Sequence, residues 1–192
     1  MISCWLAVAF LRANAHAPRD RFIAGVTRGP FVHTEIILGK DTGGVPAADT
    51  RAYSAFEGVS GFTPSKSSIQ WRNDVSSDWT VLKFQLPPGG YEKAYAVILQ
   101  VLAMDLPYNS RDLWQCCIRC CLPFEEDLDC EQPDTWKARG GVFCSQVALL
   151  LLRRVARMGL IRPPDVTRER IEETNSRGCS PNDLFRILSK DP

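Results

Sequence analysis

Histidine is scarce in this chain, which contains His16 and His33 as its two histidines among 192 residues. A mechanism in which an imidazole moves a proton is therefore restricted to these positions. His16 precedes Ala17 and Pro18 in a stretch typical of a loop. If the protein has a functional histidine, we expect it to be His33.

The chain also lacks an excess of charge of either sign. Its 23 Lys and Arg residues nearly balance 22 Asp and Glu residues, which gives a formal net charge of +1. This balance offers no electrostatic attraction for nucleic acid or for an anionic membrane, so neither is an expected partner. One local basic group remains, and we interpret Arg153, Arg154 and Arg157 as the solvated side of a helix.

No apolar run approaches the roughly 18 to 20 residues that a membrane-spanning helix needs, so no transmembrane segment is expected. The run from Ile2 to Leu11 has the length of the apolar part of a secretory signal, and Ala15-His16-Ala17 resembles its cleavage site. However, no basic residue precedes the run, and Arg12 interrupts the approach to the cleavage site. We therefore prefer a buried first strand over a signal peptide.

The eight cysteines are unevenly spaced, and four of them fall in Cys116-Cys117-Ile118-Arg119-Cys120-Cys121. Neighbouring cysteines pair with one another poorly, so this spacing favours a soluble protein of the reducing cytoplasm over a secreted disulfide scaffold. Cys130 adds to this Cys-rich insert at about 110–135. The insert leaves three interpretations open: reduced thiols, which we prefer, a zinc site, or acylated cysteines that allow peripheral membrane contact. We expect no metal and no cofactor.

The first half of the chain is a series of short apolar or alternating runs separated by Gly, Pro, Asn and Asp, a pattern typical of β-strands. The predicted strands are Ser3–Phe10, Arg21–Ala24, Phe31–Leu38, Ala52–Phe56 and Thr80–Phe84. Two intervening segments, Lys40–Asp49 and Phe56–Ser68, are predicted to be loops.

The period of the apolar residues changes after Pro88 to the i, i+3, i+4 spacing of amphipathic helices. The predicted helices are Tyr91–Met104, Cys144 to about Met158 with a stop at Gly159, and a last one that begins at Ser180 or Pro181. Strands followed by helices predict one α+β domain over residues 1–192, with an antiparallel sheet that helices cover on one face.

His33 lies in the predicted strand Phe31–Leu38, in which side chains alternate between the two faces. Glu35 therefore points to the same face, about 7 Å along the backbone, where its carboxylate can hold one ring nitrogen and orient the other. Asp49 and Glu57 are alternative orienting carboxylates. The competing interpretation is an ordinary polar pair on an exposed face of the sheet.

Cys144 follows Gly140-Gly141-Val142-Phe143 and opens the second predicted helix. The positive end of a helix dipole favours a thiolate and lowers the pKa of its thiol. The free backbone N–H groups of the first turn can also bind a developing oxyanion. The competing interpretation is a small, buried apolar side chain, which is the usual role of a free cysteine.

Taken in order, these segments resemble the circularly permuted branch of the NlpC-type papain-like cysteine hydrolases, to which the lecithin retinol acyltransferase-like proteins also belong. In that branch the histidine strand precedes the cysteine helix. The resemblance is closest to viral, phage and bacterial members and covers about residues 3 to 188. It rests on His33-Thr34-Glu35, Tyr53–Val59, Trp79–Leu82, Pro107-Tyr108-Asn109, Phe143-Cys144-Ser145-Gln146 and Cys179-Ser180-Pro181-Asn182-Asp183-Leu184.

The chain departs from the family pattern at two positions. Gln146 stands where many relatives have Glu, and we expect it on the helix surface rather than in the chemistry. Asn109 replaces the more usual Asp beside Tyr108, which weakens any role for that pair.

The resemblance implies a permuted papain-like fold, in which an antiparallel sheet or partial barrel packs against the catalytic-cysteine helix. It implies that Cys144 attacks a carbonyl and His33 transfers the proton, with Glu35 orienting His33, as a dyad or a triad. Possible oxyanion or substrate contacts are Tyr108, Phe143 and Ser145.

The implied activity is hydrolysis of an amide, ester or thioester, as a peptidase or amidase, with acyl transfer as a variant. The substrate class, whether peptide, protein or acyl lipid, stays open. Two other functions compete with this one. The first is a non-catalytic binding or virion-associated module on the same fold, and the second is a zinc-stabilised interaction protein built on the Cys-rich insert.

Overall fold

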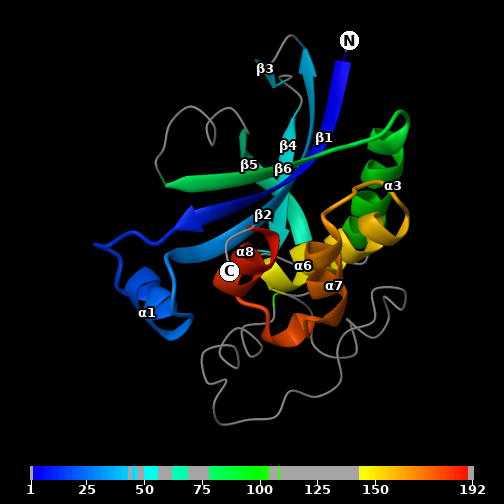
Figure 1. Cartoon of the computed structure of the whole chain (residues 1–192). Coiled ribbons are helices and arrows are strands. Elements are labelled where there is room, and N and C mark those ends of the chain that lie inside the picture. Colours follow the sequence, from blue (N-terminus) through cyan, green and yellow to red (C-terminus); the bar gives the residue numbers. More distant parts are fainter. Residues whose placement is uncertain are drawn as a thin grey trace.

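The chain forms an antiparallel sheet and a set of helices (Figure 1), which confirms the predicted α+β class and the predicted sheet type. The structure is a computed structural model that describes residues 2–42, 45–46, 50–55, 62–68, 78–103, 108 and 143–189. The strands run in the order β5-β4-β2-β1-β6, and β3 pairs with the end of β2. Their bounds are β1 Ile2–Arg12, β2 Phe31–Thr42, β3 Val45–Pro46, β4 Arg51–Ala55, β5 Phe62–Ser68 and β6 Trp79–Gln85.

The run that resembled a signal peptide is the interior strand β1, between β2 and β6. Its residues from Trp5 to Phe10 are fully buried because both neighbouring strands and both faces of the sheet cover them. Alternate side chains point to opposite faces, as strand geometry requires. Leu6, Val8 and Phe10 join the core under the helices, whereas Trp5, Ala7 and Ala9 join a smaller cluster on the other face.

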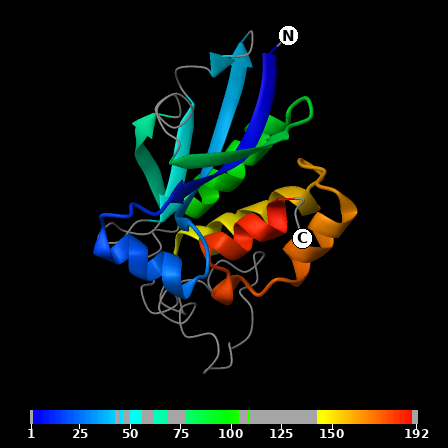
Figure 2. The same ribbon diagram turned by 60° about the vertical axis from the view of Figure 1, so that its left-hand side comes forward.

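Helix α6 is the centre of the helical layer, and Figure 2 shows it with α8 and α3 on the same side of the sheet. It contacts β2 and β4 as well as the other helices of that layer. Its residues from Val147 to Leu152 are buried because the helix is surrounded on several sides. The helices are α1 Pro18–Val26, α3 Gly90–Ala103, α6 Cys144–Arg157, α7 Asp165–Glu173, the short 3-10 helix η1 Ser176–Gly178 and α8 Pro181–Leu188.

Three predicted helices are confirmed, and their ends carry the expected signals. Gly159 follows α6 with a φ of +70°, the left-handed conformation that glycine adopts most easily. Ser180 caps α8, where its side chain accepts a hydrogen bond from the Asp183 N–H, and Pro181 occupies the first turn. Among the described residues, no helix is both long and apolar enough to cross a membrane.

Three segment predictions were wrong. Arg21–Ala24 lies in α1 rather than in a strand, because Pro18 and Asp20 form a helical first turn and a short apolar run fits either structure. The predicted loop Lys40–Asp49 contains the end of β2 and the strand β3, which pair as a hairpin. Part of the other predicted loop is β5, which pairs with β4 despite its polar sequence.

The interpretation of the basic group on α6 as a solvated helix side holds for the exposed Arg157 and the partly exposed Arg154, but it was wrong for Arg153, which is 3% exposed. Its guanidinium donates hydrogen bonds to the backbone carbonyls of Ile171, Glu172 and Thr174, at the C-terminal end of α7. These carbonyls have no partners within their own helix, and the helix dipole makes this end favourable for a cation. Arg153 therefore fastens α7, which the sequence did not predict, to α6.

Replacing Arg153 with Met should destabilise the protein by about 2–4 kcal/mol, since it removes charge-assisted hydrogen bonds and leaves buried carbonyls unsatisfied. Met keeps much of the apolar stem, so the loss measures mainly the polar contacts. Urea unfolding of the two proteins measures the difference. Arg154→Met, on the partly exposed neighbour, should change stability by about 0.5 kcal/mol or less. An equal loss in both variants would contradict this role for Arg153.

Candidate active site

The site lies where strand β4 separates from strand β2. The β2–β4 pairing ends at Ile36 opposite Tyr53, whereas β1 continues to pair with β2 past this point to His33. Thr34 consequently has no β4 residue opposite it. Its carbonyl instead accepts a hydrogen bond of 2.6 Å from the Ser54 hydroxyl, and its N–H is bonded to Cys144. The first residue of α6 thus replaces a strand partner of β2.

Cys144 occupies the first position of α6, and its side chain is almost completely buried, at 3% exposure. The extended backbone of Phe143 precedes it as the N-cap residue. The Gln146 side-chain oxygen accepts a hydrogen bond of 3.3 Å from the Phe143 N–H, which satisfies a backbone donor at the start of the helix. Gln146 is fully buried, so its expected place on the helix surface was wrong.

His33 and Glu35 lie close together, as the alternation of strand side chains predicts. The His33 Nε2 is 3.7 Å from the Glu35 Oε1, the separation of an ion pair rather than of a short hydrogen bond. Glu35 is 2% exposed, whereas the His33 side chain is 19% exposed and gives the pair its access to solvent. The interpretation as an exposed polar pair is therefore wrong. The ring of Trp79 meets the His33 ring edge-on, with 6.4 Å between centroids.

Burial disfavours the charged form of His33, but Cys144 and Glu35 more than compensate and raise its pKa from 6.5 to about 9. The attraction of the thiolate and its hydrogen bond make larger contributions than the carboxylate does. Burial likewise raises the pKa of the Cys144 thiol, but the charge and hydrogen bond of His33 lower it below its ordinary value. Backbone hydrogen bonds from Thr34 and Ser145 lower it further. Near neutral pH these contacts favour a thiolate beside an imidazolium.

The structure gives different roles to the other predicted site residues. Tyr108 is partly buried against Phe143 and Cys144, where its ring borders the nucleophile. Phe143 is fully buried, so its side chain packs in the core. The Ser145 hydroxyl donates a 2.7 Å hydrogen bond to the Cys179 carbonyl and is buried, so it holds the chain rather than facing a substrate.

Several sequence predictions lie outside the described residues. These are the alternative carboxylates Asp49 and Glu57, Asn109, and the Cys-rich insert with its zinc and acylation hypotheses. Within the ranges that the structure describes, His, Cys, Asp and Glu do not gather in a group of three or more that could hold a metal. Among the described residues, Cys4, Cys144 and Cys179 are not part of a disulfide bond. His16 is exposed in a turn, which agrees with the prediction of a loop.

Two contributors to the site were not recognised in the sequence. The Thr34 N–H is a backbone group whose availability depends on where β4 leaves β2, which no side-chain pattern records. Trp79 stands at the start of a recognised strand, but its contact with His33 depends on strand order. No family model, no curated protein and no solved structure matches this chain. Function is therefore inferred from the geometry and chemistry of the site itself.

Iodoacetamide should alkylate Cys144 rapidly at pH 6 to 8, because the thiolate forms below the ordinary thiol pKa. In His33→Ala, the imidazolium no longer opposes the effect of burial, which raises the pKa of the Cys144 thiol. The alkylation rate of Cys144 at pH 7 should therefore fall by about 100-fold, equivalent to two pKa units. Site-resolved mass spectrometry across pH 4 to 9 measures both rates. The matched control is His16→Ala, which should react like the parent. Equal rates in the parent and His33→Ala would contradict the pairing.

Replacing Glu35 with Gln keeps the side-chain shape but removes the charge beside His33. The pKa of His33 should fall, and alkylation of Cys144 at pH 7 should slow by about 3- to 10-fold, up to one pKa unit. The effect should be smaller than that of His33→Ala because Cys144 contributes more to the His33 shift than Glu35 does. The exposed Glu173→Gln is the control. If both Gln variants react alike, Glu35 does not assist His33.

Proposed function

We propose that this protein is a cysteine hydrolase that cleaves an amide, ester or thioester through a covalent thioester on Cys144. The observation that carries this proposal is the buried Cys144–His33 pair at the start of α6, with Glu35 beside the ring. A purely structural cysteine needs neither a lowered pKa nor an imidazole beside it. A nucleophile held next to a base, with the base held by a third group, is the arrangement of covalent catalysis.

In the first step, the Cys144 thiolate attacks the substrate carbonyl carbon, forming a C–S bond and moving an electron pair onto the carbonyl oxygen. Since the Ser145 N–H bonds the sulfur, the backbone N–H of Cys144 in the first turn of α6 is the candidate donor for this oxyanion. When the oxyanion collapses, the C–N or C–O bond breaks, and His33 gives its proton to the leaving nitrogen or oxygen. For a thioester substrate the C–S bond to the leaving sulfur breaks instead.

In the second step, water attacks the thioester carbonyl while His33 accepts a proton from it. Collapse releases the carboxylic acid and returns the thiolate, with His33 again protonated. A different nucleophile, such as an alcohol or amine, would make the same enzyme an acyltransferase. Glu35 stabilises the imidazolium at each stage and limits the orientations of the ring.

We propose further that the fold is the permuted papain-like fold implied by the sequence resemblance. The chain order supports it, since the histidine strand β2 precedes the cysteine helix α6 and the sheet packs against that helix. Candidate substrates are peptides, proteins and acyl lipids. Acylated cysteines of the Cys-rich insert would bring the enzyme to a membrane surface and would favour the acyl-lipid class.

An activated ester tests the covalent step directly. Incubation with p-nitrophenyl acetate at pH 7, followed by an acid quench, should place one acetyl group on Cys144, detected by peptide mass spectrometry. Acetylation should slow by about 100-fold or more in His33→Ala, within the range for loss of a general acid–base group. A burst of p-nitrophenol followed by steady release would show that the thioester is also hydrolysed.

The controls separate catalysis from simple thiol reactivity. His16→Ala should keep the parent rate, and Cys144→Ala should lose both the acetyl group and the burst while other cysteines remain. If acetylation is equally slow in the parent and His33→Ala, the hydrolase proposal is wrong. The fold would then serve the alternative function, a non-catalytic binding or virion-associated module.

A further inference from the structure

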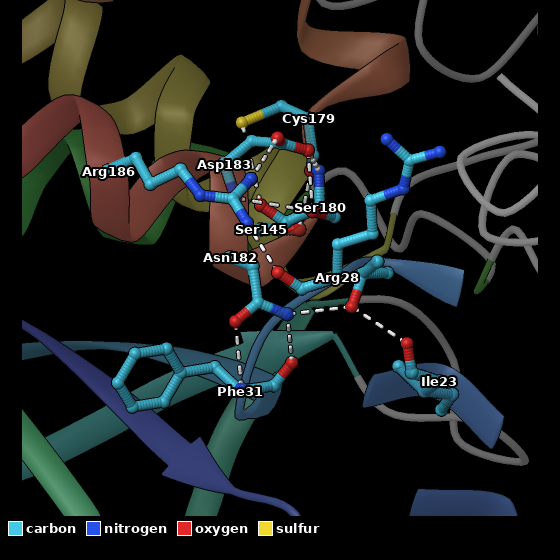
Figure 3. Close-up of polar contacts among 10 residues, drawn as sticks. Ile23, Arg28, Phe31, Ser145, Cys179, Ser180, Asn182, Asp183 and Arg186 are labelled. Atoms are coloured by element: carbon cyan, nitrogen blue, oxygen red, sulfur yellow. Dashed lines mark hydrogen bonds and ion pairs between the residues drawn. The ribbon is translucent and has the colours of Figure 1, made fainter. Parts of the chain in front are cut away.

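The two members of the catalytic pair belong to elements far apart in the sequence, β2 and α6. One short segment contacts both of them, and Figure 3 shows its polar contacts. This segment, Cys179–Asp183, precedes and opens helix α8 and is named here the α8 clamp. Its resemblance to a family motif gave it no role in the sequence analysis, and the reaction steps do not use it.

Asn182 of the α8 clamp binds the backbone of β2 in the manner of a neighbouring strand. Its Oδ1 accepts a 2.9 Å hydrogen bond from the Phe31 N–H, and its Nδ2 donates one of 2.8 Å to the Phe31 carbonyl. Nδ2 also donates to the Thr27 hydroxyl, at 2.7 Å. Asn182 is 2% exposed, and all these contacts lie within a buried environment. It therefore fixes the backbone of β2 two residues before His33.

Packing around this contact permits little movement. A Cβ at Gly29 would lie 2.3 Å from the Asn182 Oδ1, so the turn before β2 fits closely against the side chain. Phe185 of α8 packs against Phe31 with 4.6 Å between ring centroids and an angle of 48° between the ring planes. Arg186 adds a 2.6 Å hydrogen bond to the Arg28 carbonyl. The start of β2 is thus held by backbone, aromatic and polar contacts from one helix.

The other end of the α8 clamp holds the cysteine helix. The Cys179 carbonyl accepts the Ser145 hydroxyl at 2.7 Å, and Ser145 follows the nucleophile. Between the two contacts, Ser180 and Asp183 form reciprocal capping hydrogen bonds that fix the backbone of the clamp. His33 and Cys144 are therefore connected through Phe31, Asn182, Cys179 and Ser145 by short chain segments and by buried hydrogen bonds at both ends of the α8 clamp.

We propose that Asn182 is a positioning residue, which together with the Ser145–Cys179 contact holds strand β2 against helix α6 and so keeps His33 in register with Cys144. This inference rests on the proposed function, because it assigns Asn182 to the same Cys–His pair. Catalytic groups must be held within about 0.5 Å of their productive geometry by supporting contacts. Asn182 supplies such support without touching a reacting atom.

The test reads His33 directly, by NMR titration of 15N-labelled imidazoles in the whole protein. The chain has two histidines, so the imidazole signals that remain in His16→Ala belong to His33. Among the described residues, Cys144 on α6 and Glu35 on β2 are the ionisable groups that act on His33, and both stay unchanged in every variant. The alkylation rate of Cys144 at pH 7 is measured in parallel.

In Asn182→Ala, the His33 titration midpoint should fall by at least about one pH unit and alkylation should slow by about tenfold, the equivalent of one pKa unit. Thr27→Val removes one hydrogen bond of Asn182 but leaves both bonds to Phe31, and it should titrate like the parent. Arg153→Met breaks buried hydrogen bonds near the other end of α6. It should also leave the midpoint unchanged, although it loosens the fold.

A parent-like midpoint in folded Asn182→Ala would overturn the positioning role while leaving the hydrolase proposal intact. An equal shift in Arg153→Met would overturn it too, because any loosening of the fold would then suffice. If Asn182→Ala does not fold, Ser145→Ala replaces it, and the same midpoint criterion decides the result. If His33 of the parent protein titrates near 6.5, the Cys–His pair itself is absent, and the hydrolase proposal falls together with this inference.

Discussion

Where β4 leaves β2, Thr34 still pairs with β1 but has no partner on β4, so other groups must bind its backbone N–H and carbonyl inside the protein. A buried amide without a hydrogen bond costs about 1–3 kcal/mol, so this position strongly selects what can lie beside it. The Ser54 hydroxyl satisfies the carbonyl, and the sulfur of Cys144 accepts from the N–H. The hydrogen bond from the Thr34 N–H to Cys144 therefore both joins the start of α6 to the sheet and stabilises the thiolate.

The charged forms of Cys144, His33 and Glu35 stabilise one another in the buried site. Glu35 is almost completely buried, and an unpaired buried carboxylate would be costly to retain. His33 beside it provides the opposite charge, but burial also opposes that charge, and the nearby thiolate offsets this opposition. Removing His33 leaves the Cys144 thiolate and the Glu35 carboxylate desolvated without an opposite charge. This mutual dependence explains why the helix, the strand and their tie through α8 must keep a fixed relative position.

The sequence was informative wherever one local period decided the structure. Alternation identified β2 and placed His33 and Glu35 on one face, and the Ser180-Pro181 cap located the start of α8. It failed where a short apolar run fits two structures, as at Arg21–Ala24, and at β5, whose polar sequence shows no strand pattern although its backbone pairs with β4. Hydrolase chemistry and the permuted papain-like fold remain predictions.

Other features depend on tertiary contacts that no local pattern contains. The sequence predicts Arg153 to be a surface residue, whereas in the structure its guanidinium binds three carbonyls at the end of α7. In the sequence Asn182 is only the second residue of the predicted last helix, whereas in the structure its side-chain amide binds the backbone N–H and carbonyl of Phe31. The proximity of Cys144 and His33 was inferred from motif order and could not be derived from spacing.

The number of protons bound by the Cys144–His33 pair determines how the pair affects the pH dependence of stability. Because the pKa of His33 is raised from 6.5 to about 9, the imidazole alone contributes stability that is fully present below pH 6.5 and is lost as the pH rises through about 9. Because the pKa of Cys144 is lowered from 9.0, the thiol alone contributes stability that is present above pH 9.0 and is lost as the pH falls through its lowered value. At a pH above both 6.5 and the lowered pKa of Cys144, and below about 9, the folded pair holds one proton, on the ring, and the unfolded chain also holds one, on the sulfur. The two slopes cancel, so the pair can be kept in its reactive form across this window without making the stability of the fold depend on pH.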